Sequence, residues 1–222
     1  MIFRFSILLS LMSIILALPL KEADIVEFLE ARYAGDDTTV FAMMSEEFEY
    51  FHTPYIGLGL IVNYDDGNLV VEGFVQDSLR DDFQIGDLIH EVNGRRVSKM
   101  GMLIHGHEGA LQQMIITKKG DSTFTEKNVP LIRIQVSENH DEFLNSIASY
   151  GAIWHDYHLE IEEIVAAKHK FSILYHWEGS KKLDGPVYHF TAMEFIYVDK
   201  KTDLIHRVEG VWSEKQFRDQ FK

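Results

Sequence analysis

The chain has 222 residues, 46% hydrophobic and 12% aromatic, so it can bury the core of one large domain or two small ones. It contains no cysteine, which excludes disulfides, thiolate metal sites and a lipid anchor on cysteine. Its formal charge of −14 repels the phosphates of nucleic acids and of anionic lipids, so we expect no nucleic acid among its partners.

The N-terminus predicts export. Residues 1–20 combine a lone Arg4 with an apolar run from Phe5 to Leu20, which is a secretory signal pattern and slightly short for a membrane span. Ala17 is a candidate last residue of the signal peptide, but Pro19 follows closely, so an uncleaved membrane anchor stays open as an alternative. We expect the mature protein to be periplasmic or secreted.

Residues 22–54 predict two helices and a strand. A helical period runs to Gly35, which can end the first helix, and Asp37 can cap a second, short one. "FEYFH" then alternates apolar and polar residues, as a half-buried strand does. The residues expected on the inner helix faces are Ile25, Val26, Leu29 and Tyr33 in the first helix and Val40, Phe41 and Met44 in the second. So short a piece cannot enclose a core and needs partners from elsewhere in the chain.

From Tyr55 to Val136 the pattern changes to short strands and turns. "GLGLIVNY" and "NLVVEGFV" are joined by a hairpin signal at Asp66-Gly67. Further turns are predicted at Gly86-Asp87 and Asn93-Gly94, on either side of a buried strand containing Leu88, Ile89 and Val92. A loop, a strand, a hairpin at Lys119-Gly120 and a last strand ending near Val136 complete the segment.

Two motifs in this segment resemble a PDZ domain of the bacterial type. "GLGL", Gly57 to Leu60, is similar to that family's carboxylate-binding loop, and "IGDLIHEVNGRRV", Ile85 to Val97, is similar to its central strand and turn. Gly106 and Gly109 match the turn before the next strand. Gly57 and Gly59 let backbone N–H groups converge on an anion, so the free C-terminus of a peptide could dock there and pair with the adjoining strand.

The resemblance implies a peptide-binding groove completed by a helix after Asn93-Gly94. The residues it implies for peptide binding are Gly57, Leu58, Gly59, Leu60, Ile61, Met100 and Leu103. The groove helix is about a turn short and is interrupted by Gly101, and the usual start of the other helix is altered to Ser78-Leu79-Arg80. An insert that serves only as a brace or docking face, without a ligand, therefore stays open.

After Val136 the helical period returns in "ENHDEFLNSIASYGAIW", with Asn139 as its expected cap. The apolar face of this helix is predicted to hold Phe143, Leu144, Ile147, Ala148 and Gly151. Four strands follow, in "HLEIEEIVAA", "KFSILYHWEG", "PVYHFTAMEFIYVD" and "LIHRVEGVW", and the tail "SEKQFRDQFK" can form a short closing helix.

Joined across the β-rich segment, these pieces resemble the SnoaL-like branch of the nuclear transport factor 2-like superfamily. The resemblance rests on "FLEARYAGDDTTVFAMMSEEFEYFH", "WHDYHLEIEEIVAAKHKFSILYHWEG" and "YHFTAMEFIYVDKKTDLIHRVEGVW". It implies an α+β fold, a cone-shaped α+β barrel interrupted by a small β-rich PDZ-like domain. The expected organisation is a signal peptide at 1–20, the SnoaL-like domain at 21–54 and 137–222, and the insertion at 55–136.

In this superfamily the cone holds an apolar ligand or substrate, and its enzymes use a buried Asp with histidines as general acid and base. The resemblance makes Asp156, His155 and Glu209 the catalytic candidates, and places His158, His176, His189 and Trp212 around the pocket. The opposing interpretation is that Asp156 caps a turn while Trp212 fills the core. His155 and His158 also suggest a metal, but nothing supplies a third ligand, so we expect neither a metal nor a cofactor.

Two functional hypotheses follow. The first is an exported binding protein whose insert captures a C-terminal peptide or a protein partner, while the SnoaL-like domain forms a homodimer or holds a small apolar molecule. The second is a cyclase or isomerase acting on a hydrophobic carbonyl substrate, with the insert as lid or docking arm. From Tyr55 to Ser137 eight Lys or Arg face eleven Asp or Glu, net −3, against −12 for the rest of the mature chain. A carboxylate ligand would meet less repulsion at the insert, which favours the binding hypothesis.

Overall fold

The computed structural model of the protein describes residues 20–75 and 82–212. Apart from Leu20, the predicted signal peptide lies outside the described residues, and so do Ser78-Leu79-Arg80 and the predicted closing helix at 213–222. Within these two ranges no helix is long and apolar enough to cross a membrane.

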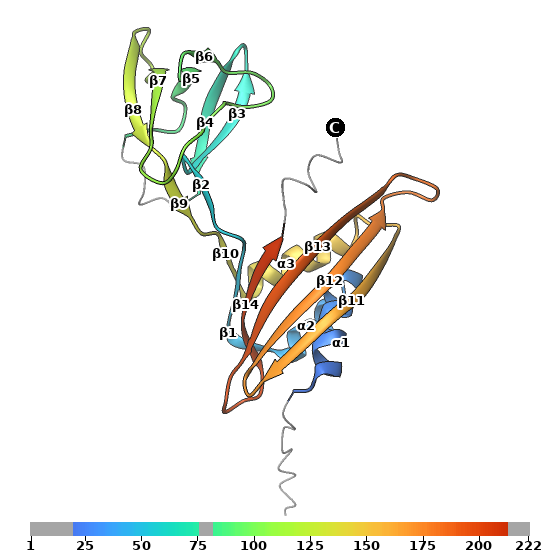
Figure 1. The fold of residues 1–222 in the computed structure, drawn as a ribbon. Helices are drawn as coiled ribbons and strands as arrows, with labels where there is room; N and C mark the ends of the chain where they lie inside the picture. The colour runs from blue at the N-terminus through green and yellow to red at the C-terminus, as the bar shows by residue number, and fades with distance from the viewer. Residues whose placement is uncertain (1–19, 76–81, 213–222) are drawn as a thin grey trace, which may run out of the picture. The chain divides into compact units, whose positions relative to one another are not determined.

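The chain divides into two compact units, which Figure 1 shows with their elements labelled. The host unit consists of residues up to Tyr50, Asn139–Val208 and Trp212. The insert unit consists of Phe51–Glu138 and Glu209–Val211, and the predicted insertion at 55–136 falls inside it.

Three helices belong to the host unit: α1 (Glu22–Ala34), α2 (Asp37–Met43) and α3 (His140–Gly151). Gly35 ends α1 in the left-handed region, with a φ of 78°, as predicted. Asn139 caps α3 as predicted, because its side chain accepts hydrogen bonds from the amides of Asp141 and Glu142. Both boundaries are therefore set by single residues that the sequence displays.

The structure corrects two expectations for α2. The cap is Asp36, not Asp37: the carboxylate of Asp36 accepts from the amide of Thr39 at 3.1 Å and from its hydroxyl at 2.7 Å. Phe41 is 57% exposed, whereas Val40 and Met44 are buried. Phe41 lies about 100° further round the helix than Val40, so the two side chains cannot share the inner face. Met44 lies beyond the helix end and is buried as the first residue of the strand that follows.

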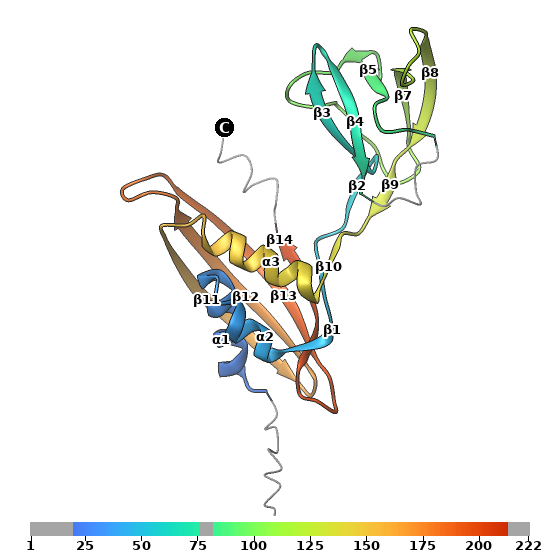
Figure 2. The same cartoon turned by 180° about the vertical axis from the view of Figure 1, so that it is seen from behind.

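The host sheet has six strands, and the four strands predicted after the last helix are confirmed. Its order is β10 (Ser137–Asn139), β1 (Met44–Phe51), β14 (Ile205–Trp212), β13 (Val187–Val198), β12 (Lys170–Ser180) and β11 (Asp156–Ala167). The three helices lie on one face of this sheet and leave the other face of β11–β13 uncovered (Figures 1 and 2). The architecture of the host unit is thus α+β, as predicted.

Strict alternation along the strands decides what reaches the core. On β12 the odd-numbered Tyr175 and Trp177 are buried, and on β13 the even-numbered Phe190, Ala192 and Glu194 are buried. The inner face is densely aromatic: the rings of Trp177 and Phe190 stack with centroids 5.2 Å apart. Large aromatic side chains therefore line the inner face of the host sheet.

The insert unit consists of strands and turns. Strands β2 (Tyr55–Gly57) and β9 (Ile132–Ile134) pair with each other, and β6 (Arg95–Arg96) pairs with β5. The main sheet runs in the order β3 (Leu60–Asp65), β4 (Asn68–Phe74), β5 (Leu88–Val92), β7 (Leu111–Thr117) and β8 (Phe124–Pro130). The predicted hairpin at Asp66-Gly67 is confirmed by positive φ angles of 42° and 84°. The predicted last strand is divided into the end of β8 and β9.

Asp87 is fully buried and ties two turns of the insert unit together. Its carboxylate accepts hydrogen bonds from the amide of Gln84 at 2.9 Å, the amide of Lys119 at 3.0 Å and the ammonium of Lys118 at 2.7 Å. Burial by itself raises the pKa of Asp87, but the bonds from Lys118 and the two amides outweigh it, so the pKa lies below its ordinary value. The Asp of "IGD" is thus a structural residue.

Replacing Asp87 by Asn is expected to lower the free energy of unfolding by about 2–4 kcal/mol at neutral pH, because it removes the carboxylate that pairs with Lys118 and leaves that ammonium only the carbonyl of Asp82 as a hydrogen-bond partner among the described residues. A carboxyl with a depressed folded-state pKa stabilises the fold above its unfolded pKa of about 3.9 and loses this effect as the pH falls. The difference between wild type and variant should therefore shrink below about pH 4, measured by urea unfolding at both pH values.

The matched control is Asp82→Asn, since the side chain of Asp82 is 64% exposed and lies 3.6 Å from Lys127. That variant should change stability by less than about 0.5 kcal/mol. Equal effects at Asp82 and Asp87 would contradict the structural role of Asp87.

Candidate functional site

The first candidate site is the free edge of the main sheet in the insert unit. Among the residues that the structure describes, β3 is the terminal strand of that sheet and pairs with β4 alone. Val62 lies opposite Val71, whose amide donates to the carbonyl of Asp87 on the far side of β4. Because backbone groups alternate along an antiparallel pair, the N–H and C=O of Val62 point outward from the free edge. They are available to an added strand.

The loop that leads into β3 depends on two glycines, Gly57 at the end of β2 and Gly59. Gly57 and Gly59 are buried, and Gly59 has a φ of 71°, which disfavours any side chain there. A Cβ at Gly57 would lie 3.1 Å from the ring of Tyr55 and 3.2 Å from Ile134. The carbonyl of Gly59 accepts from the amide of Val75 at 3.0 Å, which fixes the loop against the end of β4. The glycines are therefore required by this turn.

The two faces of β3 differ in character. Leu60, Val62 and Tyr64 are partly buried against the hydrophobic core of the insert unit. Ile61 points to the opposite face and is 49% exposed. Side chains of a strand added beside β3 would meet apolar surface on the face of Leu60 and Val62 alone.

The expected groove helix is absent: no helix occurs among the described residues of the insert unit. After Asn93-Gly94 the chain forms β6 and then a tight turn in which Ser98 bridges Gly101. Gly101 has a φ of 92°, and this left-handed turn prevents a continuous helix. Met100 and Leu103, assigned to the groove, are 80% and 53% exposed. Their neighbours Met102 and Ile104 instead pack against the same core as Leu60 and Val62.

The predicted catalytic residues belong to different units, since Asp156 and His155 are in the host unit and Glu209 is in the insert unit. Asp156, His155 and His158 are exposed where β11 begins. Glu209 is partly exposed on β14. No group of His, Asp and Glu within the described residues is arranged to hold a metal.

The predicted pocket residues are divided between the two faces of the host sheet. His158 lies opposite Glu178, and His176 lies opposite Glu160 and Thr191, all on the uncovered face. His189 is exposed on that face too, so these three histidines are not pocket residues of the interior. Each of these histidines stands one residue away from a residue that faces the interior, and successive side chains of a strand point to opposite faces, so the histidines lie on the uncovered face. Trp212 is the exception, since its ring lies 5.2 Å from that of Phe190 and packs against the core.

The polar group that does enter the interior is Glu194, which is 1% exposed at the centre of β13. Its Oε1 accepts from Arg32 of α1 at 2.8 Å, from the Tyr175 hydroxyl at 3.0 Å and from the Tyr50 hydroxyl at 3.3 Å. The hydroxyl of Tyr33 lies 2.7 Å from that of Tyr175 and extends the network. An arginine, a glutamate and three tyrosines from α1, β1, β12 and β13 thus converge beneath the helices.

The electrostatics of this cluster hold both charges in place. Burial opposes charge on Arg32, whose side chain is 15% exposed, yet its pKa lies well above the ordinary value because Glu194 and then the surrounding phenols stabilise the cation. Burial raises the pKa of Tyr33, Tyr50 and Tyr175, so these hydroxyls stay protonated and remain donors. The hydrogen bonds from Arg32, Tyr175 and Tyr50 all reach the same oxygen of Glu194, Oε1.

The second carboxylate oxygen of Glu194, Oε2, is buried and has no hydrogen-bond partner within the described part of the chain. An unpaired buried acceptor costs roughly 1–3 kcal/mol, so such atoms are rare in folded proteins and need a reason. The sequence contained the signal for this site: Glu194 interrupts the buried alternation Phe190, Ala192, Ile196. A carboxylate among the inward-facing residues of a strand is a signal that family motifs do not contain.

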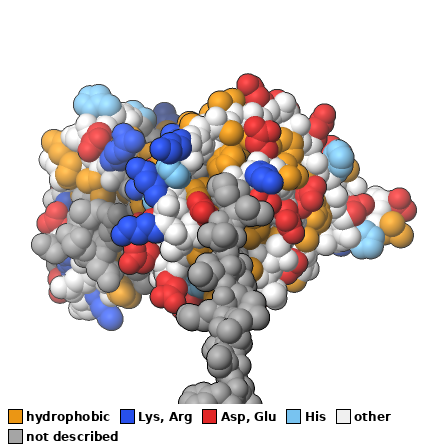
Figure 3. Space-filling model, turned by 90° about the horizontal axis from the view of Figure 1, so that it is seen from below, with side chains coloured by type: hydrophobic (Ala, Val, Ile, Leu, Met, Phe, Trp, Pro, Cys, Tyr) orange, Lys and Arg blue, Asp and Glu red, His pale blue; other side chains and the backbone are white. Residues whose placement is uncertain are grey.

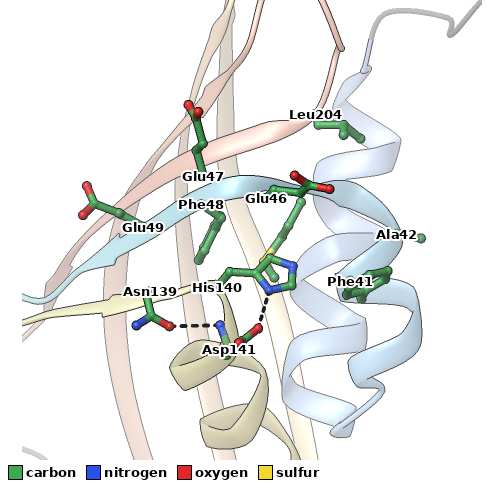
Figure 4. Close-up of a pocket in the computed structure, with 11 residues that line it drawn as sticks. Phe41, Ala42, Glu46, Glu47, Phe48, Glu49, Asn139, His140, Asp141 and Leu204 are labelled. Carbon is green, nitrogen blue, oxygen red and sulfur yellow. Dashed lines mark hydrogen bonds and ion pairs between the residues drawn. The ribbon is translucent and has the colours of Figure 1, made fainter.

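A third feature is an open pocket of about 950 Å³ on the host unit, lined by α2, β1 and the start of α3 (Figure 4). Its floor includes Phe48, and Phe41 contacts the ring of His140 edge-on at 5.3 Å. Acidic side chains surround it: Glu46, Glu47, Glu49 and Asp141. On the face shown in Figure 3, acidic side chains are likewise spread among exposed hydrophobic ones. The pocket is wide and shallow, and it contains no residue predicted to be functional.

No protein-family model matches the chain, and no curated protein matches it. Solved structures similar to it are NTF2-like and ketosteroid isomerase-like proteins. One is a hypothetical protein from Catenulispora acidiphila DSM 44928, with a ketosteroid isomerase-like fold and bound trimethylamine. It shares 7% identity at a TM-score of 0.45, covering 90% of this chain and 93% of that one.

Two others have comparable scores. An NTF2-like protein of unknown function from Burkholderia pseudomallei K96243 shares 10% identity at a TM-score of 0.44, covering 89% and 94% of the two chains. PrhC from Penicillium brasilianum NBRC 6234 shares 9% at 0.46, covering 89% and 83%. TM-scores below 0.5 carry no inference about ligand or chemistry, and the PDZ-like character of the insert stays a prediction.

Replacing Arg32 by Met is expected to lower the free energy of unfolding by about 3–5 kcal/mol, because it strands the buried charge of Glu194. The double variant Arg32→Met/Glu194→Leu should recover much of that loss, since it removes both charges. Urea unfolding of the two single variants and the double variant measures the coupling.

Glu49→Gln, an exposed change on β1, serves as control and should alter stability by less than about 0.5 kcal/mol. If the effects at Arg32 and Glu194 were simply additive, the two side chains would not form one energetic unit.

Proposed function

We propose that the protein is an exported binding protein whose insert unit captures the C-terminal segment of a partner as an added strand on β3. The terminal carboxylate would lie against the glycine loop from Gly57 to Leu60, and the segment would run along β3 toward Asp65. This is recognition by strand addition, in which backbone hydrogen bonds supply affinity and side-chain contacts supply selectivity. Export follows from the signal pattern predicted in residues 1–20.

The observation that carries the proposal is the continuity of loop and edge. A glycine turn with Gly59 in the left-handed region leads directly into a strand whose outward backbone groups have no neighbouring strand within residues 20–75 and 82–212. Proteins normally protect such edges with charges, prolines or bulges. Strand β3 has no proline, and its first three residues are Leu60, Ile61 and Val62, but its register against β4 shifts by a bulge between Ile61 and Val62. Its apolar start is suited to pairing.

The contacts also limit the kind of ligand. Leu60 and Val62 are partly buried against the core of the insert unit, as are Met102 and Ile104, so an apolar terminal residue would find hydrophobic surface on the side of Leu60 and Val62. The surface is completed by a turn instead of a helix, so less of the ligand would be enclosed. We therefore expect affinities in the micromolar range.

The test titrates the chain from Lys21 to Lys222 with fluorescent peptides that end in an apolar residue, each as a free acid and as a C-terminal amide. Anisotropy should rise with the acids and stay flat with the amides, because the loop binds the carboxylate. Val62→Ser, on the core-facing side, should weaken binding about tenfold, whereas Ile61→Ser, one residue earlier on the opposite face, should change it less than twofold.

Thermal melting of both variants shows whether either has lost its fold. Binding of amides as tightly as acids would refute the carboxylate loop, and equal effects at positions 61 and 62 would refute the orientation of the ligand. If neither peptide form bound at high micromolar protein, the insert would be a brace without a ligand.

A second candidate function is acid/base chemistry on a hydrophobic carbonyl compound in the host unit, and Glu194 is the observation that favours it. A buried carboxylate with one unpaired oxygen can accept a proton from a carbon next to a carbonyl, while a tyrosine hydroxyl donates to the carbonyl oxygen. Tyr175 and Tyr50 donate their O–H to the same carboxylate, so one of them would turn its single O–H from Glu194 to the carbonyl oxygen of the substrate. In this candidate Glu194 replaces Asp156 as the proposed base.

Deuterium exchange into β-tetralone in D2O, followed by NMR, tests this candidate. The wild type should accelerate exchange next to the carbonyl, and Glu194→Gln should reduce the rate about a hundredfold or more. Asp156→Asn, at an exposed position, is the control and should leave the rate unchanged. Exchange at the same rate without protein, or in Glu194→Gln with an intact melting transition, would eliminate the enzymatic function for this site.

A further inference from the structure

The open pocket of about 950 Å³ on the host unit lies beside a part of β1 that no strand covers (Figure 4). Strand β10 has three residues, whereas β1 has eight. The amide of His52, directly after β1, donates to the carbonyl of Val136, directly before β10, at 3.0 Å. Strand β10 therefore lies along the end of β1, and α3 begins where β10 stops. Among the described residues no strand covers this side of β1 from Met44 to Phe48, a stretch that we call the β1 edge.

The backbone of the β1 edge is directed toward the pocket side. The amide of His52 points toward β10, and alternate residues of a strand direct their N–H and C=O groups to the same side. Glu46 and Phe48 therefore direct theirs outward from the β1 edge. About five residues of strand remain uncovered there, roughly 17 Å, which is enough for a short extended segment to pair with.

The two faces beside the β1 edge differ in character. Phe48, Phe41 and His140 lie on one side of β1, and Glu47 and Glu49 extend from the other side (Figure 4). Phe48 is 1% exposed and forms the apolar floor of the pocket, while Phe41 is 57% exposed beside it. A strand added at this edge would thus find apolar surface on one face and carboxylates on the other.

Glu46 shows that no helix covers the pocket side of the β1 edge. It stands between Met44 and Phe48 among the inward-facing positions of β1, and both of these neighbours are buried while Glu46 is exposed. With Asp141 on α3, three glutamates of β1 surround the pocket, and no lysine or arginine is among the described residues that line it. The pocket therefore attracts cations and repels anions.

We propose that the β1 edge binds an extended internal segment of a partner protein in which apolar and basic residues alternate. Backbone hydrogen bonds to Glu46 and Phe48 would hold the segment as an added strand. Because side chains of a strand point alternately to its two faces, every second residue would enter the apolar pocket beside Phe41. The residues between them, lysines or arginines, would meet Glu47 and Glu49 on the other face.

Charge complementarity selects this occupant. A segment rich in acidic residues would be repelled by four carboxylates, and an uncharged one would leave them without counter-charges. The ligand also differs from the one proposed for the insert unit, since no free terminus is required. The two proposals can therefore fail independently of each other.

The test titrates the chain from Lys21 to Lys222 into a short fluorescent peptide that alternates lysine and valine. Its ends are acetylated and amidated, so that it offers no carboxylate to the glycine loop of the insert unit. Anisotropy should rise with a Kd in the micromolar range and should rise less at high salt, which screens the charges. An excess of the apolar free-acid peptide should not displace it.

Variants locate the site. Glu47→Gln/Glu49→Gln should weaken binding about tenfold, because it removes the carboxylates that the lysines meet. Phe41→Ser should also weaken it about tenfold, because it removes exposed apolar surface beside the pocket. The matched control is Glu160→Gln/Glu162→Gln, which removes two exposed carboxylates from β11 at the opposite edge of the same sheet and should change binding less than twofold. Thermal melting verifies that each variant is folded.

Two altered peptides test the mode of binding. Glutamates in place of the lysines should abolish binding, and a proline in place of the central valine should do the same, because proline cannot pair as a strand residue. Equal binding of the proline peptide would overturn strand addition. Equal losses in the β1 and β11 variants would reduce the effect to general attraction by an acidic chain. Displacement by the free-acid peptide, or no binding at high micromolar protein, would also overturn the proposal.

Discussion

The ion pair between Arg32 and Glu194 is the constraint on which the arrangement of the host unit depends. It joins α1 to the central strand β13, and three tyrosine hydroxyls surround the pair. Two charges in such a place are tolerated only when each is paired and hydrogen-bonded, so helix and sheet must meet in one register. The aromatic side chains around them fill the remaining space. The interior is therefore hydrophobic, and the ion pair within it also fixes where helix and sheet meet.

The alternation that buries Glu194 also decides what the outer face of the sheet presents. Because successive side chains point to opposite faces, fixing Glu194 inward sends Met193 and Phe195 outward. On β12 the same rule buries Tyr175 and Trp177 and exposes His176 and Glu178. The inner network and the outer imidazoles and carboxylates are thus two consequences of one register.

The insert unit is organised by backbone geometry more than by its core. Glycines in left-handed conformations shape the loop before β3, and buried Asp87 fastens two turns through hydrogen bonds. Such devices need few residues, which suits a small sheet that cannot bury much apolar surface. They also leave β3 as an open edge, and the proposed peptide site depends on that edge staying unpaired.

The sequence by itself determined the elements with local causes. Gly35 and Asn139 set helix ends, Asp66-Gly67 set a hairpin, and alternation predicted the four last strands of an α+β fold, because caps, turns and periods act over a few residues. Tertiary structure decided the rest. It turned the predicted histidines outward, replaced the groove helix by a turn at Gly101, and brought Arg32 and Glu194 together from positions 162 residues apart. Strand register and the meeting of distant residues depend on packing of the whole unit, and no local pattern specifies them.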